Sequence, residues 1–382
     1  METSKWRLVQ FHTDLISQKD NSYLSKYYES IWEQEYYHKP DAFWELPKWV
    51  AEVSYCLKKA GKSHDMQVFR SDTPIELNAD NVFGSVLDSN KHLFRRLIES
   101  NPNVTFLLGG YINPAELEYD NVFWFESVEK CMNYIMIPYE RGVDWSLFAG
   151  EKCIPRITLS YGCKHKCKFC TIPDEVIPVS HNEIYKQVLA LRPLKFNLVY
   201  IDDKTFGQCK NYNQLRTIYY SIRSFNPDFV GFVVQTTSGM VRGINWGDLH
   251  VYAAEIGVET YNDSILKELR KPSSVTMVNE AERLLKDFGI KYIPNIVVGF
   301  QQETKETYSN TFCYLASANI LYANLNNLAI YNNTDLADEI DFGVGDQNQG
   351  KSYKSYNTDE KNKIDAYAIE SMAQMLLVKN KL

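Results

Sequence analysis

Short apolar runs alternate with amphipathic stretches along most of the chain, and the spacing of the apolar positions changes at each step. In the first part, amphipathic patterns predict helices from Leu46 to Ala60 and from Lys91 to Ser100, and a third through Cys131. Five apolar runs around these helices predict strands at 8–11, 66–69, 82–87, 104–108 and 122–125. Because strands that alternate with helices form parallel sheets, residues 1–145 are predicted to form a Rossmann-like domain.

The alternation starts again at Arg156. Apolar runs predict strands at 157–160, 198–201, 229–234, 256–259, 292–298 and 324–330. Helices are predicted between them at 180–191, 215–225, 246–255 and 276–288, with another that begins at Thr304. Six such units predict a partial (βα)6 barrel over residues 150–335, with its chemistry at the carboxyl ends of the strands. A Gly-, Asn-, Gln- and Ser-rich stretch at 341–357 is predicted to be a linker, and 358–382 a C-terminal helical segment.

One short loop follows the first strand of this second set: Cys163-Lys-His-Lys-Cys167-Lys-Phe-Cys170. Three thiolates in one loop can hold three corners of a cubane iron–sulfur cluster and leave the fourth iron open. Structural zinc is the alternative, with His165 as a fourth ligand, but zinc usually takes four ligands from two separated pairs. The spacing therefore favours a cluster over zinc.

Composition limits the classes of function that remain. The chain has 382 residues, of which 45% are hydrophobic and 23% charged, so two globular domains with sizeable cores are expected. The net charge of −7 argues against general nucleic-acid binding, and no apolar stretch is long enough to predict a membrane span. The polar opening residues predict no secretory leader, so we expect a reducing, cytoplasmic location in which disulfides are disfavoured.

Four further motifs follow the cysteine loop in a fixed order. They are Tyr200-Ile-Asp-Asp203 with Phe206, Gly257-Val-Glu259, Lys267-Glu-Leu-Arg-Lys271, and Val298-Gly-Phe-Gln-Gln-Glu-Thr304. Together with the three cysteines, they resemble the radical S-adenosylmethionine superfamily, in particular the group that has a cobalamin-binding-like N-terminal domain. The resemblance covers about residues 80 to 335.

This resemblance implies that Cys163, Cys167 and Cys170 ligate a [4Fe–4S] cluster, and that S-adenosylmethionine chelates the open iron. Reductive cleavage of S-adenosylmethionine would then give a 5′-deoxyadenosyl radical for the modification of an unknown substrate, with methylation as one form. A reductant such as flavodoxin or ferredoxin is implied as a partner. No side chain is assigned a catalytic role.

Four polar residues at predicted strand ends are candidates to bind the cofactor. Asp202 and Asp203 are suited to accept hydrogen bonds from the ammonium group or ribose, although helix capping or a turn is an equal alternative. Glu259 ends a nearly apolar strand, so its carboxylate needs a partner, and a cofactor or substrate is favoured over a structural ion pair. Gln235 is a weaker candidate on the same grounds.

Two apolar or small residues complete the set of candidates. Phe169 precedes the third cysteine, where its backbone and ring can contact the adenine or simply shield the cluster. Gly299 would let the backbone approach the adenosine, with a plain turn as the equal alternative.

Cobalamin remains open as a third cofactor. Ser85-Val-Leu87 and Gly109-Gly110 resemble two signatures of cobalamin-binding domains, but an Asp-x-His-x-x-Gly motif, which would supply an axial His, is absent from the sequence. A methylthiotransferase is disfavoured because the N-terminal part holds only Cys56 and Cys131, too few for a second cluster. A non-catalytic binding protein stabilised by a metal or cluster is the alternative from a different class.

Overall fold

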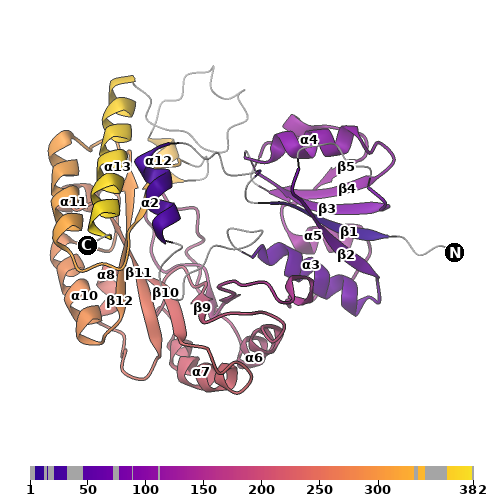
Figure 1. Ribbon diagram of the computed structural model, residues 1–382, viewed down its shortest axis with the longest axis horizontal. Coiled ribbons are helices and arrows are strands. Elements are labelled where there is room, and N and C mark those ends of the chain that lie inside the picture. Colours follow the sequence, from indigo (N-terminus) through magenta and orange to yellow (C-terminus); the bar gives the residue numbers. More distant parts are fainter. Residues whose placement is uncertain are drawn as a thin grey trace.

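The computed structural model describes residues 5–12, 15, 21–31, 46–71, 77–87, 89–110, 112–330, 334–339 and 359–380. Two parallel sheets form two lobes, the N-terminal lobe on the right of Figure 1 and the barrel lobe on the left. The mixed α/β fold class predicted from the sequence is confirmed. The predicted linker at 341–357 lies outside the described residues.

The N-terminal sheet has five parallel strands in the order β2-β1-β3-β4-β5. Leu8 on β1 packs into the core that contains α3 and α5, whereas its neighbour Val9 packs with α4 on the opposite face. This alternation places helices on both faces of the sheet. The elements are β1 (Trp6–Phe11), α3 (Lys48–Lys59), β2 (His64–Phe69), β3 (Asn81–Val86), α4 (Lys91–Glu99), β4 (Thr105–Gly110), the 3₁₀ turn η1 (Pro114–Leu117), β5 (Val122–Trp124) and α5 (Val128–Tyr134).

The second sheet has six parallel strands in the order β13-β12-β11-β10-β9-β6, which is the partial barrel predicted from the sequence. Its strands are β6 (Arg156–Ile157), β9 (Leu198–Ile201), β10 (Gly231–Thr237), β11 (Val251–Glu259), β12 (Lys291–Val298) and β13 (Asn324–Asn327). Its helices are α6 (His181–Ala190), α7 (Leu215–Arg223), α8 (Ser238–Val241), α9 (Asp263–Glu268), α10 (Val275–Asp287), α11 (Lys305–Ser317), α12 (Asp335–Asp338) and α13 (Asp359–Lys379), with 3₁₀ turns η2 (Ser146–Phe148) and η3 (Lys210–Gln214).

The helix predicted at 246–255 is wrong, because β11 already begins at Val251. β11 pairs with β10 on one side and β12 on the other, so it is a central strand. The apolar run Val251-Tyr-Ala-Ala254 at the start of this strand cannot be distinguished from a helix segment by its periodicity. Trp246 instead is buried before the strand, and its indole Nε1 donates to the carbonyl of Val241, the last residue of α8, at 2.9 Å.

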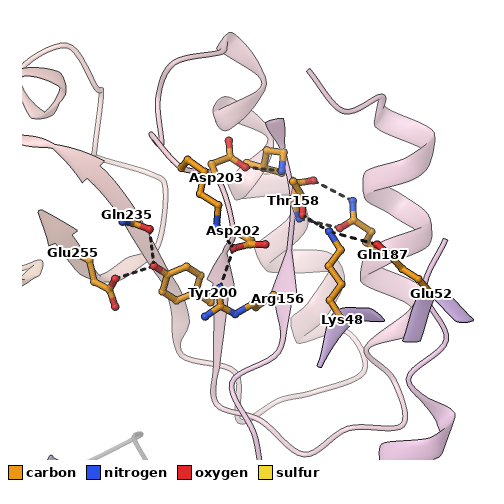
Figure 2. Close-up of polar contacts among 12 residues, drawn as sticks. Lys48, Glu52, Arg156, Thr158, Gln187, Tyr200, Asp202, Asp203, Gln235 and Glu255 are labelled. Atoms are coloured by element: carbon orange, nitrogen blue, oxygen red, sulfur yellow. Dashed lines mark hydrogen bonds and ion pairs between the residues drawn. The ribbon is translucent and has the colours of Figure 1, made fainter. Parts of the chain in front are cut away.

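The first predicted barrel strand, 157–160, is divided in the structure. β6 ends at Ile157, and Gln187 on α6 then bonds both backbone groups of Thr158, with N···O distances of 2.8 and 3.0 Å (Figure 2). The chain leaves the sheet there and forms the antiparallel pair β7 (Ser160–Tyr161) and β8 (Ile177–Pro178). This pair is the base of the cysteine loop.

A short N-terminal helix, α2 (Tyr23–Ile31), crosses to the barrel lobe and packs against α13 (Figure 1). The hydroxyl of Tyr27 lies 2.9 Å from the carbonyl oxygen of Ala323 and 2.7 Å from its amide nitrogen. The hydroxyl of Tyr28 makes the same two contacts with Leu325, at 2.9 and 2.8 Å. β13 is an edge strand, so the outward backbone groups at and just before it have no partner strand among the described residues. The two tyrosine hydroxyls form hydrogen bonds with these groups. Among the described helices, none is both long and apolar enough to cross a membrane.

Candidate cofactor site at the carboxyl ends of the barrel strands

The cysteine loop begins with a glycine that no other residue can replace without a backbone shift. Gly162 has a φ of +71°, and a Cβ atom there would lie 1.8 Å from the carbonyl oxygen of Glu175 on the returning side of the loop. The amide of Cys163 donates to Pro173 at 2.9 Å, which closes the base of the loop. The amide of Cys170 donates to the carbonyl of Cys167 at 3.0 Å, which forms a turn inside it.

The structure brings the three cysteine thiols together. Cys163 is buried, and Cys167 and Cys170 are partly exposed. Burial raises the pKa of Cys170 and raises that of Cys167 to about 11, and the neighbouring Cys163 thiol adds to both shifts. A metal centre bound here would displace these protons, because the thiolate is the ligand.

Among the residues that the structure describes, no three His, Cys, Asp or Glu side chains converge closely enough to hold a single metal ion. The ligands of a cubane cluster bind three different iron atoms, so they do not need to meet at one point. The imidazole Nε2 of His165, inside the loop, is buried and has no hydrogen-bond partner among the described residues. The loop therefore offers three sulfur ligands and one unpartnered polar atom.

A segment after β9 holds the cysteine loop in place. The carboxylate of Asp203 accepts hydrogen bonds from the amides of Leu159 and Ser160, at 2.8 and 2.9 Å, and from the Ser160 hydroxyl at 2.6 Å. Burial raises the pKa of Asp203, and these donors oppose the shift. The side chain of Asp203 therefore positions the strand that leads to Cys163, and a direct contact with the cofactor stays a prediction.

Gln208, in the same segment, was not identified from the sequence. Its Nε2 donates to Ser160 Oγ at 2.9 Å and to the Gly162 carbonyl at 3.0 Å, while its Oε1 accepts from the Lys164 amide at 3.2 Å. One amide side chain thus bonds the loop on both sides of Cys163. Its only signal in the sequence is that it closely follows Asp202 and Asp203.

Glu259 has a partner that the sequence analysis did not assign. Its carboxylate pairs with the ammonium of Lys271, and both side chains are 8% exposed. Although burial alone would lower the pKa of Lys271, the Glu259 carboxylate and the nearby thiols of Cys167 and Cys170 raise it. Glu259 also adopts a φ of +62° at a break in the pairing of β11 with β12, which is a strained backbone for a non-glycine residue. The strain and the buried charge pair lie beside the cysteines, and a cofactor contact for Glu259 stays a prediction.

Phe169 lies between the cysteines and the barrel. Its ring centroid is 5.8 Å from that of Phe300, and the ammonium of Lys271 is 5.8 Å from the ring centre. The ring therefore shields part of the loop, and its contact with an adenine stays a prediction.

Asp202 and Gln235 belong to a row of polar side chains that runs across the four strands β6, β9, β10 and β11 (Figure 2). Asp202 pairs with Arg156 at 2.9 Å, and its carboxylate lies 3.2 Å from the ammonium of Lys204. The hydroxyl of Tyr200 donates to the Glu255 carboxylate at 2.8 Å and lies 3.3 Å from the side-chain oxygen of Gln235. These side chains are partly exposed, whereas Ile201, Val234 and Ala254 on the other face are buried. One face of the barrel sheet is therefore polar and accessible.

Gly299 directly follows β12 and has a φ of +117°. Its amide lies 3.2 Å from the Glu303 carboxylate and 3.0 Å from the Tyr308 hydroxyl, which in turn donates to Asp365 on α13 at 2.6 Å. Burial raises the pKa of Glu303 to about 7. Gly299 therefore joins the strand end to the C-terminal helix, and its contact with an adenosine stays a prediction.

A separate cavity of about 380 Å³ lies in the N-terminal lobe at the carboxyl ends of β3, β4 and β5. Ser85, Gly109 and Gly110 line it, together with residues of α3 and α5. A Cβ atom on Gly110 would lie 1.9 Å from the Val86 carbonyl oxygen, so this glycine is also required for strand packing. The two signatures noted in the sequence thus meet at one cavity.

Comparison with known proteins rests on structure alone, because no family model and no curated protein matches the chain. The radical S-adenosylmethionine methyltransferase TsrM from Kitasatospora setae, solved with cobalamin and a [4Fe–4S] cluster bound, matches with a TM-score of 0.61 and 12% identity, over 88% of this chain and 78% of that one. The cobalamin-dependent S-adenosylmethionine radical enzyme OxsB, solved with aqua-cobalamin and S-adenosylmethionine bound, matches with a TM-score of 0.64 and 13% identity, over 96% of this chain and 66% of that one.

Identities this low establish the fold and not the reaction. The chain spans slightly less than two thirds of OxsB, so the activity of that whole enzyme does not transfer with the fold. The two matches extend over 88% and 96% of this chain, so they include both the five-stranded N-terminal sheet and the six-stranded partial barrel of this chain. The chain therefore has the fold of the cobalamin-dependent radical S-adenosylmethionine enzymes.

Proposed function

We propose that this protein is a radical S-adenosylmethionine enzyme whose cluster is held by Cys163, Cys167 and Cys170. The observation that carries the proposal is the grouping of these three thiols in one loop at the carboxyl ends of the barrel strands, beside the buried Glu259–Lys271 pair. Soft thiolate ligands from one loop suit an iron–sulfur cluster with an open iron. When bound and reduced, such a cluster supplies the electron that cleaves S-adenosylmethionine.

The residues of the chain bind, orient and exclude water around that chemistry. Phe169 and Phe300 cover one side of the loop with apolar surface. Glu259 and Asp202 present carboxylates at the ends of β11 and β9, where an ammonium or ribose hydroxyl group can bind. The buried hydroxyl of Thr237, at the end of β10, has no partner among the described residues and suits a polar ligand there.

The substrate is proposed to bind along the polar row of the barrel. Tyr200, Gln235 and Glu255 lie on one face of three adjacent strands, where they are partly exposed. Barrel interiors are usually filled with branched apolar side chains, so a polar, accessible face favours a ligand that forms hydrogen bonds.

The enzymatic proposal can be tested by anaerobic reconstitution with iron and sulfide, followed by reduction in the presence of S-adenosylmethionine. We expect 5′-deoxyadenosine or S-adenosylhomocysteine, detected by mass spectrometry. Cys167→Ala should abolish both products, whereas Cys313→Ala, on the exposed face of α11, should not. Absence of both products from the fully loaded wild-type protein would contradict the proposal.

Methyl transfer with cobalamin is a second candidate, and the cavity beside Ser85 and Gly109 is the observation that favours it. Cobalamin added to the protein should form a coloured complex that survives gel filtration at about one equivalent. Ser85→Phe should fill the cavity and abolish the complex, whereas Ser224→Phe, exposed at the end of α7, should not. A complex that is unchanged by Ser85→Phe would place cobalamin elsewhere.

A further inference from the structure

The side chain of Thr205 contacts the sulfur of one predicted cluster ligand. Its Oγ1 lies 3.1 Å from the Sγ of Cys163, and Thr205 is 1% exposed. We propose that Thr205 is a positioning residue that donates a hydrogen bond to the Cys163 thiolate and thereby raises the reduction potential of the cluster. The inference rests on the proposed function, because it requires that Cys163 ligates iron.

The direction of this hydrogen bond follows from the chemistry of the ligand. In the free protein either atom can donate, since both a thiol and a hydroxyl carry a proton. An iron-bound thiolate has no proton, so the Thr205 hydroxyl must then be the donor. Burial of both residues excludes water as a competing partner for the hydroxyl.

Hydrogen bonds of the neighbouring residues fix the backbone on both sides of Thr205, and its side chain is buried. The amide of Phe206 donates to the Gln235 carbonyl at 2.7 Å, which ties the segment to β10. On either side of Thr205, the side chains of Asp203 and Gln208 bond the backbone at the start of the cysteine loop. The hydroxyl and the Cys163 sulfur are therefore held against each other from both segments.

A donor directed at a ligand sulfur withdraws electron density from the cluster and favours its reduced state. This matters for the proposed reaction because the cluster must first accept an electron. Threonine offers a matched series for the test, since Thr205→Val and Thr205→Ala remove the donor while Thr205→Ser keeps it.

The test is a redox titration of the reconstituted protein followed by electron paramagnetic resonance, with iron content measured for each variant and without S-adenosylmethionine. At the wild-type midpoint potential, Thr205→Val and Thr205→Ala should each lower the ratio of reduced to oxidised cluster by about tenfold. For one electron this corresponds to a midpoint about 59 mV more negative. Thr205→Ser should keep the wild-type midpoint.

Loaded Val and Ala variants with a wild-type midpoint would overturn the inference, as would a Ser variant that shifts as far as the Val variant. A further outcome is that both donor-less variants fail to load iron while Thr205→Ser loads fully. That result would show that Cys163 needs the hydroxyl in order to ligate the cluster, which supports the positioning role. A wild-type protein that binds no iron would refute the proposed function, which the iron content reports separately.

Discussion

At the scale of single residues, the conformation of the cysteine loop depends on close backbone packing at its base. Gly162 and Gly150 both have positive φ values, of +71° and +84°. A Cβ atom on Gly162 would overlap the carbonyl of Glu175, whereas one on Gly150 would meet nothing within 4 Å. The two glycines therefore separate the effect of backbone conformation from the effect of crowding.

Gly162→Ala is expected to reduce the iron content of the reconstituted protein at least severalfold, because relieving the overlap must move the base of the loop. Gly150→Ala should retain full loading, with only the modest destabilisation of an alanine at positive φ, about 1 kcal/mol. Iron analysis and thermal unfolding of the two variants measure these effects. Equal loading in both would show that the loop tolerates the shift.

The partner of Glu259 shows what a sequence can and cannot reveal at this scale. A carboxylate at the end of an apolar strand predicts that a partner exists. Lys271, twelve positions further on, becomes that partner only because the turn after α9 brings it back to the strand end. Thr205 and Gln208 also act through contacts with residues more than 40 positions away. Their hydroxyl and amide side chains have no distinctive sequence pattern, so the sequence did not identify them.

At the scale of elements, the open edge of the half-barrel is covered by α2. Tyr27→Phe should destabilise the protein by about 1–3 kcal/mol, because the amide and carbonyl of Ala323 would lose their buried partner. Amide hydrogen exchange in the peptide that contains Ala323 should accelerate as well. Tyr23→Phe, at an exposed position on the same helix, should change neither quantity. Equal effects in the two variants would argue against an edge-covering role for α2.

The connection from β12 to α11 predicts a dependence of stability on pH. The pKa of Glu303 is about 7 in the folded protein, whereas a free glutamate has a pKa of about 4.3. Between these values the folded state binds more protons than the unfolded state, so this group lowers stability as the pH rises from about 4.3 to 7, and the loss stays constant above about pH 7. Below about pH 4 the contribution is absent.

Glu303→Gln should therefore stabilise the protein at pH 8 by an amount on the order of 3 kcal/mol, and should have little effect near pH 4.5. Denaturant unfolding at the two pH values measures the difference. Glu306→Gln, exposed in the first turn of α11, is the control and should give the same small change at both. A benefit of Glu303→Gln that does not vary with pH would contradict the assignment.

At the scale of the whole molecule, the alternation of apolar runs predicted both sheets and nearly every strand. The exceptions have physical reasons. The segment 246–255 contains the start of a central strand whose apolar run resembles a buried helix. The packing of α2 on the far lobe is a long-range contact between Tyr27 and Ala323, and local periodicity carries no information about it.

The two lobes share one continuous apolar core. Trp145 and Phe148, which lie between α5 and β6, are buried in a cluster that contains Leu8 of the first sheet and Ile201 of the second. Such a joint holds the cavity of the N-terminal lobe and the cysteine loop of the barrel in a fixed relation. The domain boundary near residue 145 stays a prediction. The buried residues beside it argue against a flexible hinge at that point.

The central claim is that three cysteines hold a cluster with one iron open to S-adenosylmethionine. The most direct measurement is the electron paramagnetic resonance spectrum of anaerobically reconstituted, reduced protein before and after S-adenosylmethionine is added, with the iron content determined on the same sample. We predict about four iron atoms per chain and a [4Fe–4S] signal that changes when S-adenosylmethionine binds. An iron-poor protein, or a full cluster whose signal is unaffected by S-adenosylmethionine, would contradict the account.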